Sequence, residues 1–103
     1  MVTPSYRILL TYSIQRGQHE LYFNYMIREF VPTLNELNIK MKWAWHVYGQ
    51  NQPHRHIEFI CQDQETLRTA LQSSAFQHAE EKLRSYTSTY KRKIVYFEER
   101  VQL

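Results

Sequence analysis

The chain has 103 residues, the common length of a single domain, so we expect one domain that spans residues 1–103. Hydrophobic residues make up 43% of it and aromatic residues 15%, enough for a packed core. The net charge of +3 is mild, which argues against a nucleic-acid partner. No run approaches the roughly 20 apolar residues of a membrane helix, and the first strand pattern starts too early for a signal peptide. We therefore expect a cytoplasmic protein without a membrane partner.

The first predicted strand covers residues 6–13, where apolar residues occupy both alternating sets, as in a central strand covered on two faces. Helical spacing follows, and the expected buried stripe is Phe23, Ile27, Phe30, Leu34 and Leu37. Pro32 lies inside this helix, where it removes a backbone hydrogen bond, so we expect a kink or a restart there. The helix should end near Asn38.

Two strands come next, at residues 39–48 and 54–61, joined by turn-forming residues between them. In the first, Met41, Trp43, Trp45 and Val47 alternate with Lys40, Lys42, Ala44, His46 and Tyr48. In the second, Arg55, Ile57, Phe59 and Cys61 alternate with His54, His56, Glu58 and Ile60. We expect a hairpin whose tryptophans pack under the helices together with Ile57 and Phe59. Cys61 should be a buried structural thiol.

The last third of the chain predicts a second helical region and a fourth strand. Asp63 can cap a first helix, and Ser74 with Gln77 forms a capping box for its continuation after a break at residues 73–74. Residues 90–97 then form a strand rich in β-branched and aromatic residues. The order is βαββαβ, an α+β class fold of the ferredoxin-like type.

This order predicts an antiparallel four-stranded sheet with the first and third strands central and both helical regions on one face. The other face is left uncovered. The second strand, at one edge, carries Trp43, Trp45 and Tyr48, and a long aromatic edge strand is an aggregation hazard when unpaired. We therefore expect the chain to work as a homodimer.

Four segments carry a resemblance to a known superfamily, and they are YRILLTYSIQRGQ, EFVPTLNEL, KWAWHVYG and SSAFQHAEEKLRSYTSTYKRKIVYFEE. With them the chain resembles the dimeric α+β barrel superfamily, most closely its small NIPSNAP-like and antibiotic-biosynthesis-monooxygenase-like proteins. The resemblance implies a barrel closed by two sheets packed face to face. It implies no single activity, because members of the superfamily include cofactor-independent monooxygenases, isomerases, haem-degrading enzymes and ligand sensors.

One constellation of polar side chains could carry chemistry. If the tryptophans face the helices, then His46, Tyr48, His56 and Glu58 share the opposite face, with His46 roughly opposite His56. One imidazole could act as a base while Glu58 fixes its tautomer, and Tyr12 or Tyr48 could orient an aromatic or keto substrate. The alternative is a hydrated interior whose polar groups satisfy one another.

Two cofactor alternatives are weaker. His54 and His56 lie two residues apart with His46 opposite and Glu58 beyond, a spacing that suits zinc or iron. In the haem-degrading members of the superfamily the axial histidine falls where this chain has Glu80. Its nearest imidazole, His78, is turned about 200° around the helix from that position. We therefore expect no cofactor.

The function that these patterns favour is the binding of a small apolar or aromatic metabolite, with cofactor-independent oxygenation or isomerisation as the reaction. The competing class is a non-enzymatic module for ligand binding or assembly, because no catalytic motif is present in the sequence.

Overall fold

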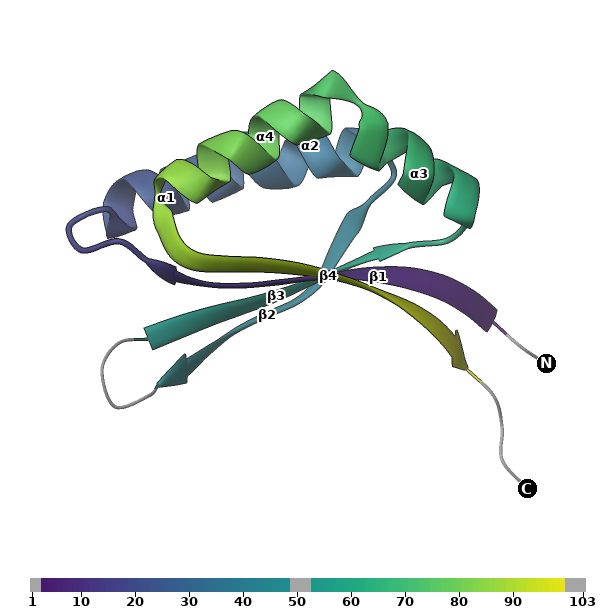
Figure 1. The fold of residues 1–103 in the computed structure, drawn as a ribbon, viewed down its shortest axis with the longest axis horizontal. Helices are drawn as coiled ribbons and strands as arrows, with labels where there is room; N and C mark the ends of the chain where they lie inside the picture. The colour runs from purple at the N-terminus through teal and green to yellow at the C-terminus, as the bar shows by residue number, and fades with distance from the viewer. Residues whose placement is uncertain (1–2, 49–52, 100–103) are drawn as a thin grey trace.

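The computed structural model describes residues 3–48 and 53–99, which form a single antiparallel sheet with a helical layer on one face (Figure 1). The strands are β1 (Thr3–Ile14), β2 (Lys40–Tyr48), β3 (Pro53–Cys61) and β4 (Thr87–Glu99). Their spatial order is β2-β3-β1-β4, so β1 and β3 are central and β2 and β4 are edges, as predicted. The ferredoxin-like α+β fold class is therefore confirmed.

The first helical region consists of three consecutive segments: α1 (His19–Tyr25), the π-helical turn η1 (Met26–Phe30) and α2 (Val31–Glu36). Pro32 lies in the first turn of α2, where its missing N–H is tolerated, so the predicted restart is confirmed. The wide π turn directly precedes the proline. It rotates the residues of α1 relative to those of α2, because each π turn contains an additional residue.

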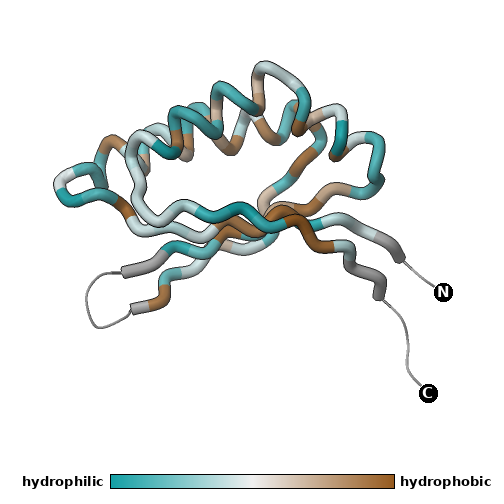
Figure 2. The backbone as a smooth tube through the Cα atoms, in the orientation of Figure 1, coloured by the Kyte–Doolittle hydropathy of each residue, from teal (hydrophilic) through white to brown (hydrophobic). Residues whose placement is uncertain are grey.

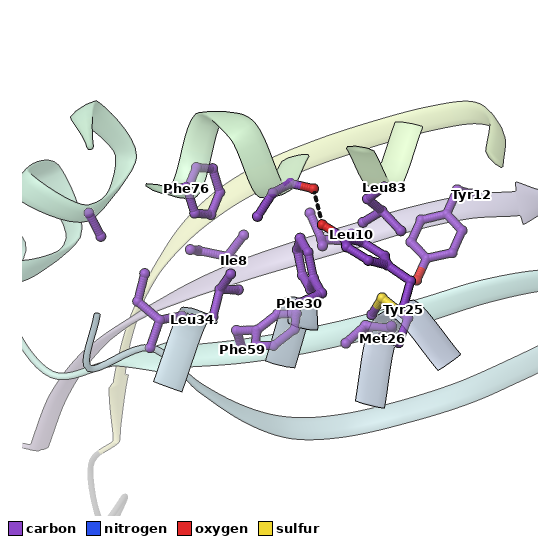
Figure 3. Packing of buried hydrophobic residues seen from close by; sticks show 14 of the residues in the cluster. Ile8, Leu10, Tyr12, Tyr25, Met26, Phe30, Leu34, Phe59, Phe76 and Leu83 are labelled. Carbon is purple, nitrogen blue, oxygen red and sulfur yellow. Dashed lines mark hydrogen bonds between the residues drawn. The ribbon is translucent and has the colours of Figure 1, made fainter. Parts of the chain in front are cut away.

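This rotation corrects the predicted buried stripe. Phe30 and Leu34 are fully buried as expected, but Ile27 is 70% exposed and Phe23 is also exposed. Their places are taken by Tyr22, Tyr25 and Met26, which the uninterrupted helical spacing did not select. The Tyr25 hydroxyl donates a hydrogen bond to the carbonyl of Ala79, so the end of α1 is tied to the second helical region (Figure 3).

The second helical region consists of α3 (Gln64–Gln72) and α4 (Ser74–Ser85). Asp63 caps α3, since its carboxylate accepts a hydrogen bond of 2.8 Å from the backbone of Thr66, as predicted. The cap of α4 is Ser73 and not Ser74, because the Ser73 hydroxyl accepts from the backbone N–H of Phe76. The predicted capping box was therefore wrong by one residue.

The core lies between the helices and the two central strands (Figure 3). Its largest fully buried side chains from the sheet are Ile8, Leu10, Tyr12 and Phe59, and from the helices Tyr22, Phe30, Leu34, Phe76 and Leu83. Hydrophobic and hydrophilic residues alternate along each helix in Figure 2, as in amphipathic helices that cover one side of a sheet. Cys61 is buried at the end of β3, and burial raises the pKa of its thiol.

Candidate functional site

The register of the β2–β3 hairpin separates the residues that we expected to converge. His46 lies opposite Arg55, and His56 lies opposite Trp45, so the expected pairing of His46 with His56 is wrong by one position. In a strand, such a slip moves a side chain to the other face of the sheet. His46 therefore points to the helical side, whereas His56 and Glu58 point to the uncovered side.

The tryptophans were also assigned to the wrong face. Trp43 is 58% exposed and Trp45 is 45% exposed, and they share the uncovered face with Glu58 and His56. On the helical side, Ile57 is paired with Ala44, and Ala44 is itself exposed. The helical layer thus does not reach over this part of the edge strand, so large apolar residues there gain no burial by facing it. Ile57 and Phe59 are buried under the helices, as predicted.

On the uncovered face, polar groups pair within the sheet. Arg7 and Glu58 form a salt bridge of 3.0 Å whose side chains are only 12% and 14% exposed. The imidazole of His56 stacks on the indole of Trp45, with ring centroids 5.4 Å apart and the planes nearly parallel. This face therefore combines a satisfied ion pair with exposed aromatic rings.

On the helical side, Tyr12 lies in a cluster of aromatic and basic side chains. Its hydroxyl shares a hydrogen bond with that of Tyr22, and its ring stacks on Tyr90. Burial is the main cause that raises the pKa of both Tyr12 and Tyr22, so both hydroxyls remain protonated at neutral pH. Tyr12 is thus a core residue whose hydroxyl already has a partner.

His46 borders this cluster. Desolvation first, and then the positive charges of Arg55 and His19, lower the pKa of His46, so its imidazole is neutral at pH 7. The guanidinium of Arg55 lies 4.7 Å from the ring centroid of Phe23 and 5.9 Å from that of Tyr22. Sequence reasoning gave Arg55 no role. The signal for one was a charged residue in the alternating set that also contains Ile57, Phe59 and Cys61.

Glu80, on α4, contacts two side chains of β4 on the helical side of the sheet. It accepts a hydrogen bond from the Tyr90 hydroxyl and forms an ion pair with Arg92 at 3.1 Å. Desolvation and the neighbouring Glu80 raise the pKa of Tyr90. Glu80, which stands where the haem-degrading members have their axial histidine, therefore has two partners within the chain.

A separate cleft opens between α3 and strands β1 and β4. Its volume is about 300 Å³, and its exposed lining is almost entirely apolar. Leu67 and Leu71 form one wall, Tyr6 and Ile94 form the other, and three longer side chains border it, namely Gln64, Arg68 and Gln72. The volume and apolar lining are those of small-molecule pockets. None of the residues predicted for the site lies here.

Two residues of the sequence-based site predictions, Tyr48 of the proposed catalytic set and His54 of the metal alternative, are described only in part. The side chains of Tyr48 and His54 lie outside the described residues, although their backbones pair with Pro53 and Val47 respectively. Within residues 3–48 and 53–99, no three His, Cys, Asp or Glu side chains gather as a metal site would require. In that same part of the chain, no helix is long and apolar enough to cross a membrane.

Neither a protein-family profile nor a curated protein matches the sequence. Solved structures do match. A NIPSNAP family protein from Agrobacterium tumefaciens has a TM-score of 0.65 and 9% identity, over 88% of this chain and 90% of that chain. An antibiotic-biosynthesis-monooxygenase-like protein from Nitrosomonas europaea has a TM-score of 0.60 and 8% identity, over 90% and 88%.

The chain shares the ferredoxin-like α+β fold of these proteins. The resemblance seen in the sequence is thereby confirmed at the level of fold. A de novo designed protein also shares this fold, with a TM-score of 0.56 and 7% identity over 94% of this chain and 99% of that one. Because a designed protein has the same architecture, the fold carries no activity with it, and function has to be argued from the sites.

Proposed function

We propose that this chain forms a homodimer that binds a small apolar or aromatic ligand in the α3 cleft of each subunit. The observation that carries the ligand proposal is the lining of the cleft, in which Leu71 and Ile94 leave apolar surface open to solvent beside the buried Leu67. Tyr6 provides an aromatic wall. An apolar ligand that fills about 300 Å³ would remove this surface from water, which is the main driving force for such binding.

The homodimer proposal depends on the uncovered face of the sheet. Trp43, Trp45 and Val47 alternate along β2 and are all exposed on this side. Monomeric proteins seldom leave a contiguous row of large apolar side chains in water. A second copy is the occupant that we favour, because a twofold axis brings the same face of each sheet together and the superfamily that shares this fold is typically dimeric.

The dimer is tested by placing a charged side chain on the apolar face of the sheet. We expect Trp45→Glu to convert a dimer into a monomer at micromolar concentration in size-exclusion chromatography with light scattering, because a carboxylate would be desolvated at the interface. Ile27→Glu is the matched control, since Ile27 is exposed on the helical layer. The dimer proposal fails if the unmodified chain is monomeric, or if both variants change the mass equally.

Ligand binding is tested with 1-naphthol and indole as probes, by saturation-transfer difference NMR. Ile94→Trp should fill the cleft and weaken binding, whereas Leu21→Trp adds the same ring at an exposed helical site and should not. Absence of saturation transfer to either probe, or equal signals in the two variants, would contradict the cleft as the binding site.

Within this proposal, an enzyme differs from a binding module in having a side chain at the ligand site that can accept a proton. The lining of the α3 cleft contains no His, Asp or Glu, which favours the non-enzymatic module. Cofactor-independent oxygenation or isomerisation remains the second proposal, because His46 is neutral at pH 7 and could accept a proton. For that reaction we keep Tyr12 and Tyr48 with His46 as proposed residues. His56 and Glu58 lie on the other face of the sheet, so we propose them only as a separate site. Oxygen uptake with 1-naphthol, abolished by His46→Gln, is the expected result for an enzyme.

A further inference from the structure

The basic cluster at the hairpin end of the helical side lacks an anion. Arg55 has its Nε atom buried without a hydrogen-bond partner, and among the described residues no carboxylate forms an ion pair with it. Residues 49–52 follow β2 in the sequence, read GQNQ and include no acidic residue. Glu98 and Glu99 pair with the opposite end of β1, so they are far from this cluster. Within residues 3–48 and 53–99, the groups that contact the guanidinium of Arg55 are therefore aromatic rings.

Those rings leave part of the guanidinium available. Phe23 and Tyr22 approach the central carbon of Arg55 at 4.7 and 5.9 Å from their ring centroids. A guanidinium that contacts aromatic rings can still donate paired N–H groups to one oxyanion in its own plane. His46 pairs with Arg55 across the β2–β3 ladder, so its imidazole lies on the same side of the sheet. Two basic side chains from neighbouring strands therefore meet here.

We propose that Arg55 and His46 form a binding site for a small oxyanion, a carboxylate or a phosphate group. Arg55 would supply a charge-assisted pair of hydrogen bonds, and the imidazole of His46 would add a donor when it is protonated. The site is distinct from the α3 cleft. Tyr6 borders the cleft and Tyr12 contacts the basic cluster, and six residue steps along β1 separate them by about 20 Å.

The proposal predicts that the affinity for the oxyanion depends on pH. Without the anion, desolvation, Arg55 and His19 lower the pKa of His46, whereas a bound negative charge would favour its protonated form. Binding is therefore coupled to proton uptake, and affinity should rise as the pH falls through the pKa of His46. The other titratable groups that face the cluster, Tyr12 and Tyr22, have raised pKa values and stay neutral throughout.

NMR titration of the histidine side chains tests this site, with acetate, benzoate and inorganic phosphate as separate probes at constant ionic strength. We expect saturable shifts of the His46 ring. Arg55→Gln should weaken binding about tenfold or more, since charge-assisted hydrogen bonds are lost. Arg28→Gln is the matched control, because it removes the same charge from an exposed position in η1. Stronger binding of benzoate than of phosphate would assign the oxyanion to a carboxylate, and the reverse order would assign it to a phosphate.

Non-saturating shifts with all three probes, or equal affinities in Arg55→Gln and Arg28→Gln, would overturn the proposal. Circular dichroism establishes that each variant is folded. If Arg55→Gln is unfolded, the unmodified chain decides by its pH dependence. Acetate should bind more tightly at about pH 5.5 than at about pH 8, and His46→Gln should reduce that difference. An affinity in the unmodified chain that does not change over this range would overturn the site.

Discussion

The two faces of the sheet differ in how far their apolar side chains are buried, although the same strands supply both. Toward the helices, β1 and β3 contribute Ile8, Leu10, Ile57 and Phe59, which are buried within the chain itself. On the other side, β2 exposes Trp43 and its neighbours, and the ion pair of Arg7 with Glu58 lies among them. The comparison teaches that hydrophobicity in a strand does not identify the core. A large apolar side chain on the helical side is buried only where a helix lies above it, since Met41 pairs with Phe59 on that side and is still exposed.

The largest predicted effect is a difference in stability loss between two aromatic residues, one on each face of the sheet. Phe59→Ala should lower the free energy of unfolding by about 3–5 kcal/mol, because it leaves a cavity against Phe30. Trp43→Ala should change the stability of the isolated chain far less, since Trp43 is exposed there. Urea denaturation at low protein concentration measures both. Equal losses would mean that the two faces are energetically alike.

A smaller effect concerns the ion pair on the uncovered face. Glu58→Gln should cost about 1–3 kcal/mol, since Arg7 is mostly shielded from water and would lose its charged partner. Glu65→Gln is the control, because Glu65 and Arg68 form an exposed pair at 3.9 Å, and such pairs contribute about 0–1 kcal/mol. Thermal denaturation at neutral pH should distinguish them, and a harmless Glu58→Gln would show that water already screens this face.

On the helical face, the tyrosine pair should have an effect of about 1 kcal/mol. Tyr12→Phe leaves the Tyr22 hydroxyl buried without its partner, whereas Tyr12→Phe combined with Tyr22→Phe removes both groups. The double variant should therefore be no less stable than the single one. A double-mutant cycle from urea denaturation measures this coupling. Additive losses in the two single variants would exclude a coupled pair.

The same tyrosines predict an alkaline limit. Burial raises the pKa of Tyr12 and Tyr22 in the folded state, so the unfolded chain releases these protons at lower pH. Their contribution is complete below about pH 10, the unperturbed value, and is lost as the pH rises above it. Circular dichroism from about pH 9 to 12 should therefore show the fold losing stability as these two hydroxyls ionise in the unfolded chain. Tyr12→Phe should shift this transition to higher pH.

The smallest predicted effect lies in the helical layer that defines the covered face. Ser73→Ala should destabilise the fold by about 1 kcal/mol, because Phe76 loses the oxygen that caps its N–H. Ser74→Ala, one residue later, should have little effect. Thermal denaturation compares the two directly, and a larger loss for Ser74→Ala would restore the capping assignment that the sequence pattern favoured.

The sequence by itself determined the local features of this protein. Periodicity placed the four strands and the order βαββαβ, Asp63 was identifiable as a cap, and Pro32 marked the restart of the helix. These features depend on residues within one or two turns of each other. They can be predicted because backbone hydrogen bonding and side-chain spacing over such distances are set by the chain itself.

Tertiary structure decided the rest. The hairpin register placed His46 beside Arg55 and not beside His56, and the coverage of β2 left Trp43 in solvent. With the π-helical turn after α1, Tyr22 is buried in the core and Phe23 is exposed. In each case two alternating or helical sets contained suitable residues, so the local pattern allowed either. The choice depends on which neighbour pairs with a strand or lies above it, and such contacts between distant segments are absent from local spacing.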